Sequence, residues 1–150
     1  MKSFRCAFAG IWHAVKTERN FRIHIAAVFY VVLGGLLLFF SIYEWAWIAL
    51  ACGLVFGAEL VNTALERLCD DLKPGHSPVI KTVKDLAAGA VLVCALAAAG
   101  MAVALFWEPV YLYLQWWELS DLTTRPEFWI GVIALPGWIW FVFGFGRGKK

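Results

Sequence analysis

The sequence has 150 residues, of which 62% are hydrophobic and 16% are charged, and its formal net charge at pH 7 is +2. Charged residues make up about 25% of an ordinary soluble domain, so this composition excludes an aqueous globular protein and indicates an integral membrane protein of one domain. The mean hydropathy of +0.73 agrees with this interpretation. We expect the lipid bilayer, and no nucleic acid, among the partners of the chain.

Residues 1–20 have the pattern of an amphipathic helix. At about 100° per residue, apolar side chains share one face and basic side chains surround the rest. The apolar residues are Phe4, Phe8, Ile11, Trp12 and Val15, and the basic residues are Lys2, Arg5, Lys16 and Arg19. Such a helix lies in the membrane interface. The alternative, a soluble arm, would leave Trp12 and two phenylalanines nothing to bury against.

Three apolar runs follow, at residues 23–43, 45–68 and 86–107, and each is long enough to cross the hydrocarbon core of a bilayer. Between the second and third runs, residues 67–85 are polar and contain two proline turns, which predicts a loop in water. The third run is rich in Ala and Gly, residues that let helices approach closely in lipid.

The C-terminal part, residues 108–150, forms an extension. Acidic residues alternate with Trp and Tyr between 108 and 127, a composition that suits a headgroup-level belt outside the cytoplasm. A fourth apolar run at 128–145 is expected to be a span, with a kink at Pro136. The chain therefore divides into residues 1–107 and this extension.

Basic residues predict the orientation. Of the 13 Lys and Arg residues, all but Arg125 fall before the first span, in the polar segment after the second, or at the C-terminus. Four spans with both termini in the cytoplasm satisfy the positive-inside rule. The predicted fold class is an all-α integral membrane helical bundle of four spans with an N-terminal interfacial helix.

The second span carries an acidic face. Glu59, Asn62, Thr63, Glu66 and Asp70 stand at offsets 0, 3, 4, 7 and 11, which fall on one side of a helix. A carboxylate at mid-depth costs roughly 2.5 to 3.5 kcal/mol, so it usually faces protein or water and marks a site. The alternative for Glu59, an acid at a helix end that reaches for the headgroups, does not explain the other polar residues in register.

The predicted topology places this face across the membrane boundary. Glu59 lies eight residues deeper than Arg67, roughly 12 Å at the helical rise. Further polar groups of the same side are Glu18, Lys84 and Asp85. Clustered carboxylates suggest Mg²⁺, which is held by one or two carboxylates plus substrate phosphates, and a lysine can contact phosphate. Glu59 is then the base at the depth of a lipid hydroxyl.

The three segments 18–24, 59–66 with Asp70, and 84–91 resemble the signature of the bacterial diacylglycerol kinase family, which includes the undecaprenol kinases. The first reads Glu-Arg-Asn-Phe-Arg-Ile-His and the third Lys-Asp-Leu-Ala-Ala-Gly-Ala-Val. Their order and spacing extend over residues 1–107. The resemblance implies a homotrimeric lipid kinase domain in the cytoplasmic (inner) membrane of a bacterium.

It also implies the role of each site residue. Glu59 is expected to be the catalytic base, and Glu18 and Glu66 to hold Mg²⁺. The residues expected to contact ATP are Glu18, Asn62, Glu66, Gly75, His76, Ser77, Lys84 and Asp85. The acceptor is the primary hydroxyl of diacylglycerol or undecaprenol, and the forms of the first and third segments are closer to the undecaprenol kinases.

The residues leave one other class of function open. A proton or cation carrier without transferase activity would also use an intramembrane Glu59, but it would not need Lys84 and Asp85. His24, at the start of the first span, is expected to be an interfacial hydrogen-bond partner. The fourth apolar run is absent from the three-span pattern, and we expect it to have a packing role.

Overall fold

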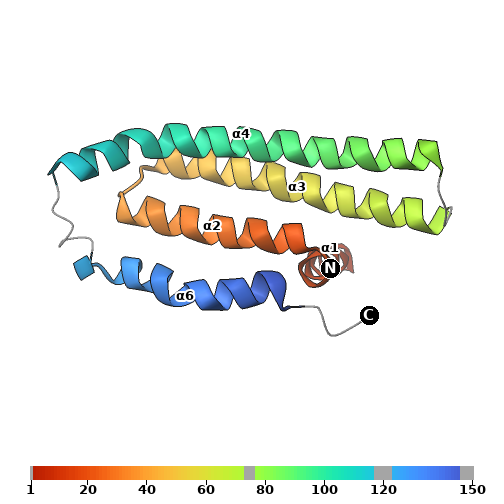
Figure 1. The fold of residues 1–150 in the computed structure, drawn as a ribbon, viewed down its shortest axis with the longest axis horizontal. Helices are drawn as coiled ribbons and strands as arrows, with labels where there is room; N and C mark the ends of the chain where they lie inside the picture. The colour runs from red at the N-terminus through yellow and green to blue at the C-terminus, as the bar shows by residue number, and fades with distance from the viewer. Residues whose placement is uncertain (1, 73–76, 117–122, 146–150) are drawn as a thin grey trace.

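The computed structural model describes residues 2–72, 77–116 and 123–145, and this part of the chain is helical with no strand (Figure 1). Its helices are α1 Lys2–Thr17, α2 Arg19–Leu37, α3 Ile42–Leu72, α4 Pro78–Trp116 and α6 Pro126–Phe143. Of these, α2, α3, α4 and α6 are long and apolar enough to cross a membrane. The prediction of an all-α membrane bundle with an N-terminal helix and four spans is confirmed.

The four long helices lie side by side in the order α4, α3, α2, α6 (Figure 1), and the contacts between helices pair the same neighbours. The short helix α1 lies across one end of this layer, where it contacts both α2 and α3. Phe4, Phe8 and Trp12 of α1 are exposed, as expected of a helix whose apolar face meets lipid. The same end holds the start of α2, the end of α3 and the start of α4.

The prediction of a loop at residues 67–85 was wrong over most of that range. Helix α3 continues to Leu72 and α4 begins at Pro78, so only a short connection remains between them. Polarity does not end a helix, and the sequence has no helix-breaking residue before Pro74. Pro78 occupies the first position of α4, where a missing N–H is tolerated. The α3–α4 hairpin therefore extends past α1 (Figure 1).

Helix α4 also runs on past residue 107. It includes Pro109 and ends at Trp116, so the first part of the expected headgroup belt continues the third span as a helix. The residues from 117 to 122 lie outside the described part of the chain. Helix α6 then begins at Pro126, two residues before the predicted fourth span, and contains Pro136.

Two adjacent glycines allow α2 to approach its neighbours at the end opposite α1. A Cβ atom on Gly34 would lie 2.7 Å from Cε1 of Phe106 in α4, and one on Gly35 would lie 2.9 Å from the Trp45 ring in α3. Phe40 packs against both rings, with centroid distances of 4.8 Å to Phe106 and 6.2 Å to Trp45. This aromatic cluster joins three spans at their far end.

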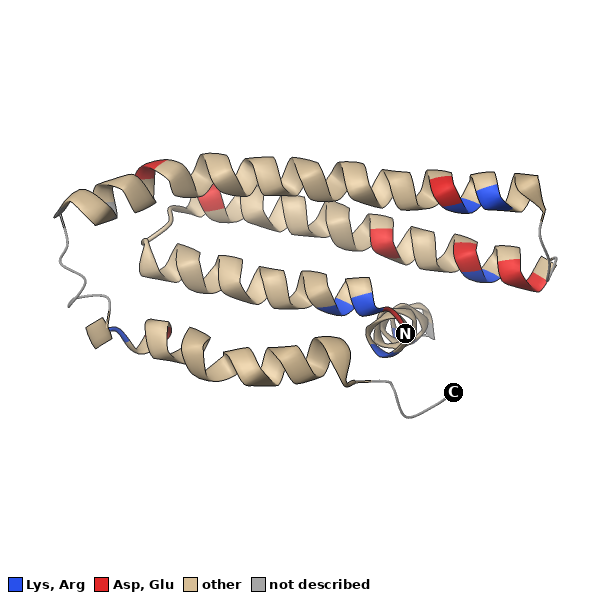
Figure 2. Cartoon of the chain, viewed as in Figure 1, with Lys and Arg blue, Asp and Glu red and all other residues tan. Residues whose placement is uncertain are grey.

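Charged residues gather at the α1 end of the layer (Figure 2). They lie on the first turn of α2, the last turns of α3 and the first turns of α4, whereas the middle of each long helix is uncharged apart from Glu59 of α3. Placing a long apolar stretch in lipid costs little free energy, whereas placing a charge there costs several kcal/mol. The layer thus has one polar end, and the candidate site residues lie there.

Candidate active site

Glu59 is the buried acid of α3, with 3% of its surface exposed. Its Oε1 atom lies 3.2 Å from Nε2 of His24 on α2, and the His24 side chain is 23% exposed. Glu18 and Glu66 are close enough to Glu59 to interact with it electrostatically. Glu59 therefore faces protein between two spans, which disfavours the alternative of an acid that reaches out to the headgroups.

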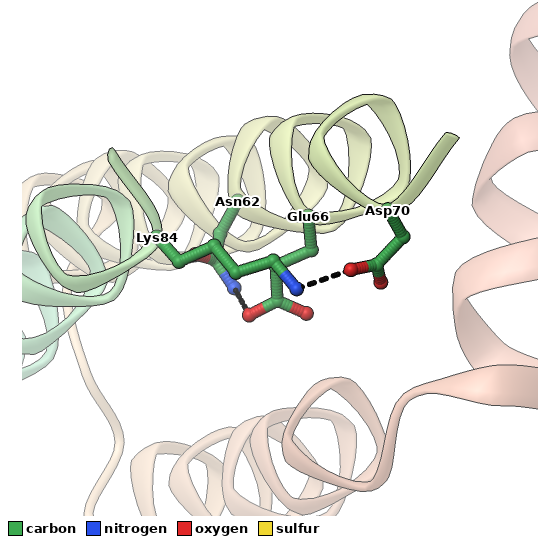
Figure 3. Close-up of polar contacts among 4 residues, drawn as sticks. All are labelled: Asn62, Glu66, Asp70 and Lys84. Atoms are coloured by element: carbon green, nitrogen blue, oxygen red, sulfur yellow. Dashed lines mark hydrogen bonds and ion pairs between the residues drawn. The ribbon is translucent and has the colours of Figure 1, made fainter. Parts of the chain in front are cut away.

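The other polar residues of the predicted face follow Glu59 along α3 toward water. Thr63 is buried, Asn62 and Glu66 are half-buried, and Asp70 is exposed. The Asn62 Nδ2 group donates a hydrogen bond to Glu66 Oε1 at 3.1 Å (Figure 3). One continuous helix thus carries a graded row of polar groups from the membrane interior to its edge.

Lys84 brings α4 to the same row. Its Nζ atom lies 2.5 Å from Asp70 Oδ1, so an ion pair joins the first turns of α4 to the last turns of α3 (Figure 3). Lys84 remains 34% exposed and Asp70 68% exposed. The ammonium group is therefore held in place and still accessible to a second anionic partner such as a phosphate.

Glu18 lies at the junction of α1 and α2. It is the residue before the first turn of α2, its backbone is extended, and its side chain is half-buried. Thr17 Oγ1 donates a hydrogen bond to Glu18 Oε1 at 2.9 Å. This carboxylate therefore stands at the boundary of α1 and α2, within electrostatic range of Glu59.

The remaining expected nucleotide contacts are at the α3–α4 connection. Ser77 directly precedes α4, and its carbonyl accepts a hydrogen bond from the Lys81 N–H at 3.0 Å. Asp85 is exposed beside Lys84. Gly75 and His76 lie outside the described residues. Of the expected set, the structure joins Asn62 to Glu66 by a hydrogen bond and places Glu18 and Glu66 within electrostatic range of Glu59. Lys84 pairs with Asp70, which was not in the expected set.

An apolar cavity of about 210 Å³ lies between α2, α3 and α4. Its lining is mostly alanine and aliphatic side chains, including Ala98, Ala99 and Ala102 of α4. The alanine-rich face of α4 packs along α3, but here it leaves space instead of closing it. His24 is the lining residue of α2 nearest to the α1 end. The cavity therefore ends at the residue that contacts Glu59.

The oxygen donors of this region, carboxylates and an amide, are of the kind that a hard cation takes. Asn62 Oδ1 is buried without a hydrogen-bond partner among the described residues, and it lies on the side chain that orients Glu66. No group of three or more described His, Cys, Asp or Glu residues is close enough to hold a metal ion by itself. Mg²⁺ usually takes only one or two carboxylates and fills its other positions with water and phosphate oxygens.

Two residues have roles that the sequence did not indicate. Arg22 was counted toward the orientation of the chain and belongs to the family segment 18–24, but no structural role was expected for it; it is buried, with 6% exposure. His24 was expected to be an interfacial hydrogen-bond partner, and the structure places its Nε2 atom 3.2 Å from Oε1 of Glu59. The signal available for His24 was a polar residue within an apolar run, in a chain whose next span carries the intramembrane Glu59.

Comparisons with known proteins agree with this arrangement. The sequence profile of the family described as prokaryotic diacylglycerol kinase matches residues 5–106. The undecaprenol kinase of Bacillus subtilis is 47% identical over 95 residues, which cover 63% of this chain and 77% of that protein. A diacylglycerol kinase of Synechocystis sp. is 46% identical over 98 residues, which cover 64% of this chain and 55% of that protein. No solved structure matches the chain.

The matched region contains most of α1, all of α2 and α3, and most of α4, with all the polar residues described above, whereas α6 lies outside it. The resemblance of the three sequence segments is thereby confirmed. The chain belongs to the prokaryotic diacylglycerol kinase family of membrane lipid kinases.

Proposed function

We propose that the chain transfers the γ-phosphate of ATP, with Mg²⁺, to the primary hydroxyl of diacylglycerol or undecaprenol. The observation that carries this proposal is the position of Glu59. It is a buried carboxylate that lies between an apolar cavity and a polar row that ends in water. A group that must meet both a lipid hydroxyl and a nucleotide phosphate belongs at such a boundary.

Glu59 acts as the general base in this proposal. It accepts the proton of the lipid hydroxyl as the hydroxyl oxygen bonds to the γ-phosphorus and the bond from that phosphorus to the β-phosphate oxygen breaks. General-base catalysis contributes typically about 10²- to 10⁴-fold to a rate. His24, 3.2 Å from the Glu59 carboxylate, orients it. The lipid oxygen and the base therefore meet at the end of the cavity.

The phosphates are held from two sides. Glu18 and Glu66 would hold Mg²⁺, and a bound Mg²⁺ would supply charge neutralisation for the phosphates. Asn62 fixes the orientation of the Glu66 carboxylate through its 3.1 Å hydrogen bond. Lys84 contacts the phosphates as a point charge, and Asp85 and Ser77 border the nucleotide. Phosphoryl transfer asks the protein mainly for this positioning and charge neutralisation.

The apolar chain of the acceptor occupies the cavity between α2, α3 and α4. Its alanine-rich lining offers no hydrogen bond along most of its length, which suits a hydrocarbon chain. The forms of segments 18–24 and 84–91 favour undecaprenol modestly. The two relatives, one named for each lipid, have nearly equal identity to this chain.

We also propose a homotrimer with both termini in the cytoplasm. Helix α4 buries none of its described side chains within one chain, so its apolar surface is available to neighbouring subunits as well as to lipid. The charged residues lie mainly at the α1 end of the layer (Figure 2), which agrees with a cytoplasmic position for that end. Cross-linking in native membranes tests the subunit number.

The test is phosphate transfer from labelled ATP in detergent micelles with Mg²⁺, with diacylglycerol and undecaprenol offered side by side. Labelled phosphatidic acid identifies a diacylglycerol kinase, and labelled undecaprenyl phosphate identifies an undecaprenol kinase. Glu59→Gln, which keeps size and polarity but cannot accept the proton, should lose activity while it still binds ATP. A Glu59→Gln protein with near-parental turnover would remove Glu59 from the proposed mechanism.

A further inference from the structure

Arg22 joins three helices with one buried side chain. Its Nη1 group donates to the carbonyls of Val15 at 3.0 Å and Lys16 at 3.3 Å. Its Nε and Nη2 groups both donate to the carbonyl of Val142, each at 3.3 Å. The guanidinium group of α2 therefore contacts the backbone of α1 on one side and of α6 on the other.

These carbonyls are groups that a helix leaves unpaired. Val15 and Lys16 lie in the last turn of α1, and Val142 lies in the last turn of α6. The last four carbonyls of a helix have no partner within it, and they form the negative end of its dipole. Arg22 thus caps two helix C-termini at once, which explains how a cation is buried there.

Other contacts hold α6 along α2. The Tyr30 hydroxyl donates to the Gly131 carbonyl at 3.2 Å, and the rings of Phe29 and Trp138 lie 5.2 Å apart. The buried residues Ala14, Val15 and Phe21 form a small cluster at the α1 end. Phe141 of α6 and Phe145, just after α6, pack against this cluster. The fourth span therefore contacts α1 as well as α2.

Glu18 lies at the junction that these contacts stabilise. It stands between α1 and α2, four residues before Arg22, and is close enough to it to interact electrostatically. Through Arg22, the end of α6 restrains the last turn of α1 relative to the first turn of α2. That restraint fixes the backbone that carries Glu18.

We infer that α6, which lies outside the region matched by the family, acts through Arg22 to position Glu18 for the metal-bound nucleotide. Arg22 is a positioning residue, because it contacts backbone carbonyls rather than reacting groups. The inference rests on the proposed kinase function for its kinetic consequence. Its structural consequence, restraint of α1 by α6, is measurable without any activity.

The test uses the full-length protein in detergent and separates α6 from α2 with one substitution. A Cβ atom on Gly131 would lie 2.8 Å from Cδ2 of Leu33 on α2, whereas one on Gly137 would meet nothing within 4 Å. Gly131→Phe should therefore displace α6, and Gly137→Phe is the matched control on the same helix. Arg22→Gln removes the double cap, and Arg22→Lys keeps the charge.

Two measurements are made on each variant: amide hydrogen exchange of residues 14–18, and the KM values for ATP and for the lipid together with kcat. Gly131→Phe and Arg22→Gln should each speed exchange at 14–18 by about tenfold, because the local opening becomes easier. Each should raise the KM for ATP by about tenfold, as for a lost charged hydrogen bond, and change the KM for lipid much less. Gly137→Phe should match the parent, and Arg22→Lys should recover part of the loss.

The double variant should change no more than the stronger single variant, because both substitutions remove the same restraint. If α6 loses protection in Gly131→Phe while residues 14–18 exchange as in the parent, the inference is wrong. If exchange accelerates as expected but the parent phosphorylates no lipid, the restraint stands and the proposed kinase function fails. Should Gly131→Phe not fold, Tyr30→Phe removes only the hydroxyl bound to Gly131 and should give the same effects at smaller size.

Discussion

Nε2 of His24 lies 3.2 Å from Oε1 of Glu59 and thereby joins the first and second membrane spans at the inner end of the polar row. A carboxylate buried among apolar side chains needs a polar partner. The imidazole places a nitrogen at ion-pair distance from an oxygen that has no hydrogen-bond partner among the described residues. Catalytic bases are commonly oriented in this way by a neighbouring side chain.

We expect His24→Ala to lower kcat by up to about 10²-fold, the size of the effect of a misplaced catalytic group. The KM for ATP should change little, because His24 lies on the cavity side of Glu59. His24→Gln, which keeps a donor amide, should retain more activity than His24→Ala. His13→Ala, at an exposed position of α1, is the control. Equal kcat values for His24→Ala and the parent would contradict an orienting role.

The ion pair between Lys84 and Asp70 is predicted to serve nucleotide binding. Lys84→Ala should raise the KM for ATP by about ten- to a hundredfold, the range for loss of a hydrogen bond to a charged group. Asp70→Asn should raise it less, because the ammonium group remains but is no longer held in place. Lys81→Ala, one turn earlier and exposed, should bind ATP as the parent does. The free energy of unfolding should change little in all three variants, because the ion pair is on the surface.

The Asn62–Glu66 hydrogen bond predicts a specific metal dependence. Chelation of divalent ions should abolish transfer, and added Mg²⁺ should restore it. Asn62→Ala frees the Glu66 carboxylate and should raise the Mg²⁺ concentration for half-maximal activity by about ten- to a hundredfold, as for other residues that orient a metal ligand. Asp71→Asn, an exposed acid off the polar row, should leave the Mg²⁺ titration unchanged. A shift of the same size in Asp71→Asn would point to a general charge effect.

The cavity is predicted to bind the apolar chain of the acceptor. Ala98→Phe places a ring in its lining and should raise the KM for lipid several-fold. The KM for ATP should stay near the parental value, because Lys84 and Asp85 lie near the start of α4, outside the lining. Ala97→Phe, at an exposed neighbouring position outside the lining, is the matched control. If both variants have parental lipid kinetics, the acceptor chain lies elsewhere.

Much of this protein was predictable from local pattern. Hydropathy identified a membrane bundle with four spans, because burial in lipid requires long apolar helices. Helical periodicity placed Glu59, Asn62, Glu66 and Asp70 on one face of α3, because that relation depends only on the geometry of one helix. The three sequence segments identified the family for the same reason: each is a short run whose spacing is visible along the chain.

The predicted loop at 67–85 shows where local pattern fails. Polarity indicates contact with water, and it was interpreted as irregular structure, yet a helix that leaves the membrane keeps its backbone hydrogen bonds. Helix α3 continues to Leu72, and helix α4 already begins at Pro78. As a result Lys84 and Asp70 face each other across a helical hairpin instead of lying in a loop.

The membrane class, the spans and the polar face of α3 could be predicted without a structure, since they depend on composition and on the repeat of a single helix. The contacts of His24 with Glu59, of Lys84 with Asp70, and of Arg22 with both α1 and α6 could not. Each of these contacts joins two helices. Their distances depend on the register and rotation of one helix against another, which packing of the whole bundle sets.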